Sequence, residues 1–322
     1  MKLLEVEGLT TYYRLKEGYV RACEDITLQL EQGEALGLVG ESASGKTTAA
    51  LSLIKLLPEN AQIMSGSIRV DGREIAGASE GELRRIRWKE ISIIFQGAMN
   101  ALNPVRKVGD QIVEALRIHE KLSEKEACLR TVKLFEKVEI DTDRVKDYPH
   151  EFSGGMRQRV MIAMAIACNP KIVIGDEPTT ALDVMVQAQV LQLLEQLRRE
   201  RRMGMILITH DLSVVGETCD RVAVMYAGKI VETGPTEIVF TNPAHPYTQA
   251  LIAAFPNIEG ERCLAASIPG DPPNLLYPPS GCRFHERCDQ VLPCCSEEEP
   301  LSISLAKDHI AACNLLKRRV ML

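Results

Sequence analysis

The sequence predicts an α/β protein with a parallel sheet core, a helical insertion and a loop-rich C-terminal extension. Short apolar runs alternate with helical patterns on both sides of a helical block at about residues 98–165. This order is typical of a parallel sheet covered by helices. Beyond about residue 238, prolines, cysteines and short polar stretches replace these patterns. We therefore expect a large domain over residues 1–238 and an extension over residues 239–322.

The individual elements follow from the periodicity of apolar residues. Residues 1–35 alternate apolar and polar positions, which predicts antiparallel strands. Ala35–Val39 is an apolar run typical of a buried strand, and Thr47–Leu57 predicts a helix that ends at Pro58. We expect further helices at Val108–His119, Glu124–Val138, Met156–Cys168 and Val186–Arg201, and further buried strands at Ile91–Phe95, Ile172–Ile174, Met205–Thr209 and Val222–Met225.

Composition and charge exclude several classes of protein. Among 322 residues, 45% are hydrophobic and 25% charged, which is a globular mixture rather than a disordered one. The net charge of −6 gives no indication of a nucleic-acid partner. The longest uncharged apolar stretch, Val160–Cys168, is shorter than the roughly 18 residues of a spanning helix. Glu5 and Glu7 lie where a signal peptide would have its uninterrupted apolar segment. We expect a cytoplasmic chain, and any role at a membrane would depend on a partner.

A glycine-rich segment lies between the predicted strand at Ala35–Val39 and the helix that follows. Gly40–Thr47 reads GESASGKT and fits the phosphate-loop pattern GxxxxGK[ST]. A plain glycine-rich turn is the alternative, but the flanking strand and helix favour phosphate binding, because backbone N–H groups and a helix N-terminus attract anions. Lys46 is expected to reach the β- and γ-phosphates, and the Thr47 hydroxyl to bind Mg²⁺. The expected nucleotide-binding residues are Gly40, Ser42, Ala43, Ser44, Gly45, Lys46, Thr47 and Thr48.

Two carboxylates end a predicted buried strand further along the chain. Asp176 and Glu177 follow Ile172–Ile174. Two acids after a strand are often only a solvated strand end. Together with a phosphate loop, however, Asp176 is suited to hold Mg²⁺ through its waters, and Glu177 to activate the attacking water.

A second glycine-containing loop carries a family resemblance. Phe152–Gln158 resembles the signature loop of ABC ATPases. Locally it predicts a serine N-cap and a glycine turn at a helix start, which is also an anion site. The resemblance implies a P-loop (RecA-like) ABC ATPase core with an antiparallel β subdomain and a helical subdomain. It also implies that Ser153, Gly154 and Gly155 face ATP held by a second subunit, so that ATP lies between two subunits.

Other landmarks of this family occur in the expected order. Gln96 resembles the glutamine that senses Mg²⁺ and couples to the membrane subunit, and His210 resembles the switch histidine that contacts the γ-phosphate. Asp183, in Ala181–Asp183, resembles the loop that communicates across the dimer. For the aromatic residue that stacks on adenine we expect Tyr13, with Tyr12 and Tyr19 as alternatives.

The resemblance extends to the ATP-binding subunits of oligopeptide and dipeptide importers. Phe95–Pro104, Glu177–Val184 and Asn242–Thr248 resemble segments of that branch. It implies ATP and Mg²⁺ as cofactors, and a position at the cytoplasmic face of the membrane. The implied partners are a second ATPase subunit, two membrane permease subunits and, indirectly, an extracytoplasmic peptide-binding protein. Relatives also carry nickel, glutathione and sugars, so a nickel or other solute importer is an alternative.

The sequence departs from the family pattern at three positions. Ala43 replaces a glycine inside the phosphate loop, which is tolerable if its φ is negative. Gly175 replaces an alanine before Asp176, and Phe152 replaces the leucine that starts the signature loop. None of the three removes a group that does chemistry.

Five of the ten cysteines lie in the last 41 residues. Disulfides are disfavoured in a reducing compartment, so the cluster indicates a metal site. Cys282, Cys288, Cys295 and Cys313 resemble the segment of the peptide branch that is associated with a [4Fe–4S] cluster. A zinc site is the alternative, and Cys294 is one residue out of register. We expect a structural role, because a short loop-rich segment has little core.

The sequence argues against two other classes of protein, a soluble ABC-type ATPase and an iron–sulfur electron carrier. A soluble ABC-type ATPase acting on DNA would insert long coiled coils between phosphate loop and signature, and none is predicted here. One acting on ribosomes would carry two ATPase units in one chain. An iron–sulfur electron carrier would not need the full set of ATPase motifs. The sequence therefore favours transport.

Overall fold

The computed structural model describes residues 2–97, 101–180, 182–254 and 268–320. The chain forms two compact units, which are described one at a time. Unit 1 consists of Met1–Leu4, Gln29–Glu34 and Arg69–Ile208. Unit 2 consists of Glu5–Leu28, Ala35–Ile68 and Thr209–Leu322.

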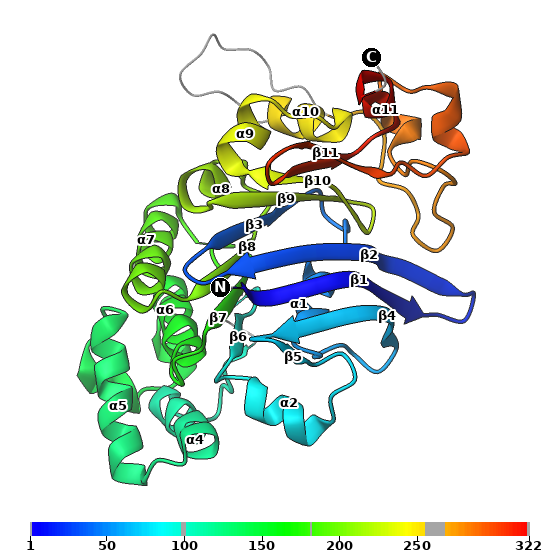
Figure 1. Ribbon diagram of the computed structural model, residues 1–322. Coiled ribbons are helices and arrows are strands. Elements are labelled where there is room, and N and C mark those ends of the chain that lie inside the picture. Colours follow the sequence, from blue (N-terminus) through cyan, green and yellow to red (C-terminus); the bar gives the residue numbers. More distant parts are fainter. Residues whose placement is uncertain (1, 98–100, 181, 255–267, 321–322) are drawn as a thin grey trace. The chain divides into compact units, whose positions relative to one another are not determined.

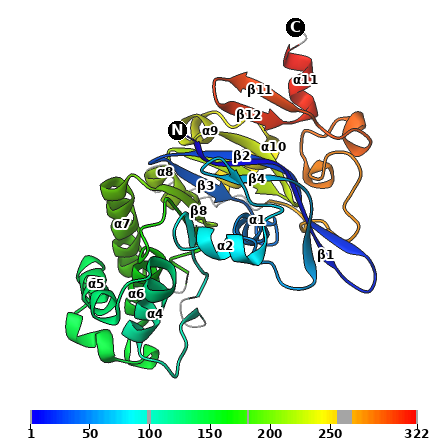
Figure 2. The same cartoon turned by 60° about the horizontal axis from the view of Figure 1, so that its bottom comes forward.

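Unit 1 combines a small parallel sheet with a group of helices. Its central strand β7 pairs in parallel with β6 on one side and β8 on the other. Helices α4 to α7 pack near one another, as the green elements of Figure 2 show. The elements are β5 (Arg73–Glu74), α2 (Glu80–Ile86), β6 (Ile91–Ile94), α4 (Val108–Glu120), α5 (Glu124–Lys137), η1 (Thr142–Lys146), η2 (Pro149–Glu151), α6 (Gly154–Ala165), β7 (Ile172–Asp176), α7 (Val184–Arg201) and β8 (Gly204–Ile208).

Burial explains the strands of this unit. All five residues of β7 and all five of β8 are buried, as expected for strands whose two faces are both covered. Helices α4 and α5 each bury one apolar stripe, and Ser123 caps α5 through a capping box with Glu126. The helices predicted in the block at residues 98–165 are thereby confirmed to within a few residues at each end.

Unit 2 contains the strands β11-β12-β10-β9-β3 of one sheet and most of the strands β2-β1-β4 of a second sheet, whose remaining residues belong to unit 1. Strands β3 and β9 are parallel, whereas β9, β10, β12 and β11 pair antiparallel in succession. The elements are β1 (Lys2–Arg14), β2 (Tyr19–Glu31), β3 (Ala35–Val39), α1 (Lys46–Leu53), β4 (Ala61–Val70), α8 (Leu212–Thr218), β9 (Arg221–Tyr226), β10 (Lys229–Pro235), α9 (Thr236–Thr241), α10 (Pro246–Ala253), η3 (His285–Arg287), η4 (Pro293–Ser296), β11 (Ser302–Ala306), β12 (His309–Ala312) and α11 (Asn314–Val320). Figure 1 shows them along the chain.

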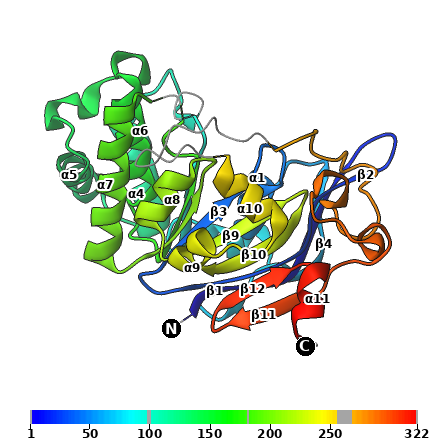
Figure 3. The same ribbon diagram turned by 90° about the horizontal axis from the view of Figure 1, so that it is seen from above.

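The C-terminal extension continues the sheet of unit 2. Glu232 and Thr233 of β10 pair with Ala311 and Ile310 of β12, and Figure 3 shows the red β11–β12 hairpin beside β10. The expected boundary near residue 238 falls inside α9, and both sides of it belong to unit 2. Within the described residues, no helix combines the length and apolarity that crossing a bilayer requires.

Candidate functional site

The phosphate loop of unit 2 joins β3 to α1, and its two outer glycines have no room for a side chain. Gly40 and Gly45 have φ angles of 152° and 104°. A Cβ atom would lie 2.1 Å from the Met225 carbonyl oxygen at Gly40, and 2.2 Å from the Ala22 carbonyl oxygen at Gly45. Both contacts are far closer than side chains tolerate, so these positions require glycine.

The ammonium group of Lys46 ends within the loop. Its Nζ donates to the carbonyl oxygens of Gly40 and Glu41, both at 2.8 Å, and contacts Ser44 Oγ at 3.3 Å. The side chain is buried. A buried cation beside a helix N-terminus and a run of loop N–H groups is the arrangement that binds phosphate.

Ala43 adopts a φ of 64°, which corrects the expectation of a negative value. A residue with a Cβ atom pays a steric cost in this left-handed region, of about 1–2 kcal/mol. The loop therefore keeps its shape although one of its positions is strained, as functional loops often do.

The predicted adenine-stacking residue lies close to the helix that follows the phosphate loop. The Tyr13 hydroxyl is 3.2 Å from Thr48 Oγ1 in α1. Tyr12 instead donates to Glu24 at 3.0 Å, and Tyr19 is 48% exposed. This contact favours Tyr13 among the three, and its stacking role stays a prediction. His210, also in unit 2, is exposed just before α8.

In unit 1, Asp176, the predicted Mg²⁺-binding carboxylate, and Glu177, the predicted catalytic one, lie at the end of β7. Asp176 is buried, and Glu177 has a φ of 47° with its N–H bonded to the Ile208 carbonyl at 2.9 Å. Gln96 Nε2 donates to Glu177 Oε2 at 2.7 Å, and Thr180 Oγ1 donates to the same oxygen at 2.8 Å. The structure thus brings Gln96 and Glu177 together, 81 residues apart in the chain. Sequence analysis missed Thr180, although it follows the carboxylate by three residues, a spacing that favours such a contact.

The signature loop and the Asp183 loop of unit 1 also lie together. Ser153 caps α6 by accepting from the Met156 N–H at 3.3 Å, and Asp183 caps α7 by accepting from the Val186 N–H at 3.0 Å. A Cβ atom on Gly155 would lie 2.5 Å from Val186 Cγ1, which explains the glycine. A Cβ atom on Gly154 would lie 3.7 Å from Leu182 Cδ2, so this residue is next to Leu182. Two capped helix N-termini therefore start side by side.

Phe152, the departure at the start of the signature loop, has a specific partner. Its ring is buried, and the Arg144 guanidinium carbon lies 4.6 Å from the ring centroid. Arg144 also donates to the Glu151 carbonyl at 2.7 Å and contacts Met156 Sδ at 3.3 Å. A cation over an aromatic ring is favourable, so the larger residue gains a contact that leucine cannot make.

The predicted site residues thus fall into two groups, one in each unit. Tyr13, the phosphate loop and His210 belong to unit 2, whereas the residues after β6, in the signature loop and after β7 belong to unit 1. Ala98–Asn100 and Ala181, which carry part of the family resemblance, lie outside the described residues. The unit 1 group is Gln96, Ser153, Gly154, Gly155, Asp176, Glu177 and Asp183.

The four predicted cysteine ligands lie near one another in unit 2. The pKa of the Cys282 thiol is raised to about 11, mainly by burial and in smaller part by the nearby Cys295, Cys313 and Cys288. Backbone N–H groups act in the opposite direction: they lower the pKa at Cys282, Cys288 and Cys313, in each case from the residue two positions later. Across the described residues, no group of three or more His, Cys, Asp or Glu side chains has the arrangement of a metal-ion site.

Two family models and several solved structures match this chain. The family model described as ABC transporter matches residues 23–180, and the model described as oligopeptide/dipeptide transporter, C-terminal region, matches residues 231–295. Two solved structures share the fold. The dimeric ATP-binding cassette MJ0796 bound to ADP and Pi gives a TM-score of 0.66 at 26% identity, covering 72% of this chain and 98% of its own. The cbiO1 structure from Clostridium perfringens gives 0.64 at 28%, covering 75% and 91%.

Curated relatives align over nearly the whole chain. The oligopeptide transport ATP-binding protein OppD of Salmonella typhimurium is 47% identical over 97% of this chain and 93% of its own length. OppD of Escherichia coli is 48% identical over 93% and 89%, and OppD of Bacillus subtilis is 47% identical over 96% and 87%. The chain therefore belongs to the family of oligopeptide transport ATP-binding proteins, which are ABC ATPases.

Proposed function

We propose that this chain hydrolyses ATP to drive a membrane importer of oligopeptides or dipeptides. The observation that carries the proposal is the match beyond the ATPase core. Residues 231–295 fit the C-terminal region of oligopeptide and dipeptide transporters, and OppD relatives align over up to 97% of the chain. A generic ABC ATPase would share the core alone.

The chemistry follows from the two groups of side chains. Backbone N–H groups of the phosphate loop and Lys46 bind the ATP phosphates. Thr47, Gln96 and Asp176 are the residues that would hold Mg²⁺, directly or through water, and the bound ion would neutralise charge on the phosphates. Glu177 takes a proton from the attacking water, and the hydrogen bond that Gln96 donates to the Glu177 carboxylate keeps it oriented. His210 contacts the γ-phosphate, and Tyr13 stacks on adenine.

The signature loop acts on the ATP of a second subunit. Ser153, Gly154 and Gly155 start α6, whose N-terminus suits a γ-phosphate, and Asp183 starts the neighbouring α7. A cassette relative is described as dimeric with ADP and Pi bound, which supports an ATP site shared by two subunits. The second subunit is identical or a paralogue. Two permease subunits and an extracytoplasmic peptide-binding protein complete the importer, with this chain at the cytoplasmic face of the membrane.

Our assignment for the four cysteines of the extension is an iron–sulfur cluster, and a zinc ion is the alternative. Cys295 raises the pKa of the thiols of Cys282, Cys288 and Cys313, and each of these three also faces a backbone N–H; thiols with such hydrogen bonds are the donors that iron–sulfur clusters use. We propose that Cys282, Cys288, Cys295 and Cys313 hold a [4Fe–4S] cluster with a structural role.

Peptide uptake tests the proposed function. Cells lacking this chain are supplied with the wild-type protein, Glu177→Gln or Glu217→Gln, and uptake of a labelled tripeptide is measured. Glu217 is an exposed glutamate of α8 and serves as the matched control. Wild type and Glu217→Gln should restore uptake, and Glu177→Gln should not. Unchanged peptide uptake in the absence of the chain, together with lost nickel uptake, would support the alternative of a nickel importer.

A further inference from the structure

The cysteine-rich extension contacts the phosphate loop through an ion pair. Arg287, the last residue of η3, donates from Nη1 to Glu41 Oε2 at 2.7 Å and from Nη2 to Glu41 Oε1 at 3.0 Å. Glu41 is the second residue of the loop, and the Arg287 side chain is only 6% exposed. A bidentate pair whose arginine is buried fixes both the position and the orientation of the carboxylate.

A second contact holds the backbone at the same position. The Glu41 N–H donates to the Tyr247 hydroxyl at 2.9 Å. The Tyr247 ring packs edge-on against Phe284 of the extension, with centroids 5.3 Å apart, and both rings are buried. Phe284 therefore supports the tyrosine that binds the loop.

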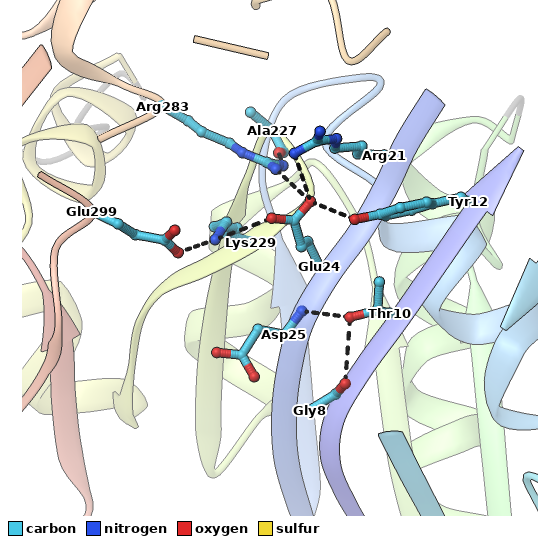
Figure 4. A network of polar contacts seen from close by, with 10 residues as sticks. All are labelled: Gly8, Thr10, Tyr12, Arg21, Glu24, Asp25, Ala227, Lys229, Arg283 and Glu299. Carbon is cyan, nitrogen blue, oxygen red and sulfur yellow. Dashed lines mark hydrogen bonds and ion pairs between the residues drawn. The ribbon is translucent and has the colours of Figure 1, made fainter. Parts of the chain in front are cut away.

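A third contact runs through the turn between β9 and β10. Arg283 donates to the Ala227 carbonyl oxygen, and its Nη2 donates to Glu24 Oε2 at 2.9 Å (Figure 4). In the same turn, the Gly228 N–H donates to the Ser44 carbonyl at 2.8 Å. The arginine thus braces a turn that is itself bonded to the phosphate loop.

The three contacts act on the part of the loop that holds Lys46, the predicted phosphate-binding side chain. The Glu41 carbonyl accepts from Lys46 Nζ at 2.8 Å and from the Ser44 N–H at 3.2 Å. The position of Glu41 consequently affects both the lysine and the backbone N–H groups of the loop. In addition, the Arg287 guanidinium compensates a negative charge in a loop that has to receive a triphosphate.

We propose that residues 283–287 of the extension position the phosphate loop for ATP, with Arg287 as the positioning residue. The extension thereby raises the affinity for ATP, in addition to any role with other subunits. The inference rests on the proposed binding of ATP by residues 40–48. Cys282 and Cys288 immediately flank this segment, so whatever anchors them also fixes its two ends.

Affinity for ATP, measured per folded protein, tests the proposal. Arg287→Ala, Arg287→Lys and Glu41→Gln are compared with Lys307→Ala, which removes an exposed cation of the extension outside the segment. Dissociation constants are measured with a fluorescent ATP analogue, KM and kcat by phosphate release, and folding by thermal denaturation. Losing a charged hydrogen-bond pair should weaken ATP binding about tenfold in Arg287→Ala. Arg287→Lys should lie between this variant and wild type, and kcat at saturating ATP should change little.

A double variant separates charge from position. In Arg287→Ala the Glu41 carboxylate has lost its arginine partner. If its negative charge contributes to the loss of ATP affinity, the double variant with Glu41→Gln should bind ATP at least as well as Arg287→Ala alone. Equal ATP affinity in folded Arg287→Ala and Lys307→Ala would overturn the proposal, as would a loss confined to kcat. Lys46→Ala reports on the proposed function separately. If Lys46→Ala still bound ATP normally, the ATP site itself would be misassigned.

Discussion

Gln96 and Thr180 both donate to one oxygen of Glu177, at 2.7 and 2.8 Å. Gln96 follows β6 and Glu177 follows β7, two neighbouring parallel strands of unit 1. The carboxylate is therefore oriented by donors from two loops. A carboxylate that is held in place loses little freedom when it accepts a proton from water, which is what a general base requires.

Removing either donor should slow ATP hydrolysis. Gln96→Ala or Thr180→Val leaves the carboxylate with one donor fewer, and we expect kcat to fall about tenfold, the value of a charged hydrogen bond. Gln196→Ala is the matched control, because it removes a glutamine that donates to Glu200 on the surface of α7 at 2.8 Å. Phosphate release at saturating ATP measures the effect. A Gln96→Ala enzyme as fast as Gln196→Ala would contradict the orienting role.

The strain at Ala43 predicts an unusual response to substitution. Ala43→Gly should stabilise the protein by about 0.5–1 kcal/mol, because glycine adopts a φ of 64° freely but gains entropy in the unfolded chain. Ala43→Val should destabilise it, because a β-branched side chain is worse at positive φ. Ala50→Gly, inside α1, should destabilise by about 1 kcal/mol. Urea denaturation measures all three. If both Ala43→Gly and Ala50→Gly lowered the free energy of unfolding, the φ of Ala43 would not determine how this position responds to substitution.

His245 makes the stability of unit 2 depend on pH. Burial lowers its pKa to about 3, and its Nδ1 accepts from the Tyr247 N–H at 3.0 Å, so the folded protein keeps it neutral. The unfolded chain binds a proton below about pH 6.5, and stability is lost as pH falls from there toward 3. Between pH 7 and 5.5 this loss is about 1 kcal/mol.

His245→Asn tests this dependence, because asparagine keeps an N-cap acceptor for α10 without titrating. The free energy of unfolding of this variant should fall less steeply between pH 7 and 5.5 than that of the wild type. His150→Asn, at an exposed histidine, should keep the wild-type slope. Parallel slopes for wild type and His245→Asn would rule out the assignment.

The extension provides a test that combines colour and nucleotide affinity. Protein purified without oxygen should contain about four irons per chain and be brown, and Cys288→Ser should lose both. Because Arg287 adjoins Cys288 and binds Glu41, Cys288→Ser should also weaken ATP binding. Cys294→Ser should change neither property. One bound zinc without iron or sulfide would refute the cluster, and it would leave the contact with Glu41 to be tested alone.

Local sequence patterns predicted many of the helices and strands. Contacts between residues distant in the sequence did not follow from these patterns. Ala35–Val39 and Val108–Glu120 have nearly the predicted bounds, because apolar periodicity reports burial directly. The helix expected to reach Leu57 ends at Leu53, since Lys55 adopts a φ of 50°. The pair between Glu41 and Arg287 joins residues 246 apart, and no periodicity signals such a contact.

The site shows the same division. Motif spacing predicted the phosphate loop, the signature loop and Glu177, because each motif is a continuous segment with its own backbone requirement. The left-handed conformation of Ala43 was not predicted, because an alanine in the sequence gives no sign of a positive φ. Thr180 was missed because a threonine in a turn has many ordinary roles. Strand β12 was missed because its four residues show little alternation.

Glu177→Gln tests the central claim most directly. The substitution keeps the size of the side chain and an oxygen for Gln96 and Thr180, but it removes the base. Phosphate release should fall by about 10²–10⁴-fold. The variant should still bind ATP and accumulate as an ATP-bound dimer on size exclusion, whereas Glu217→Gln should hydrolyse ATP at the wild-type rate. Wild-type phosphate release by purified Glu177→Gln would show that another group performs the chemistry and would contradict the account.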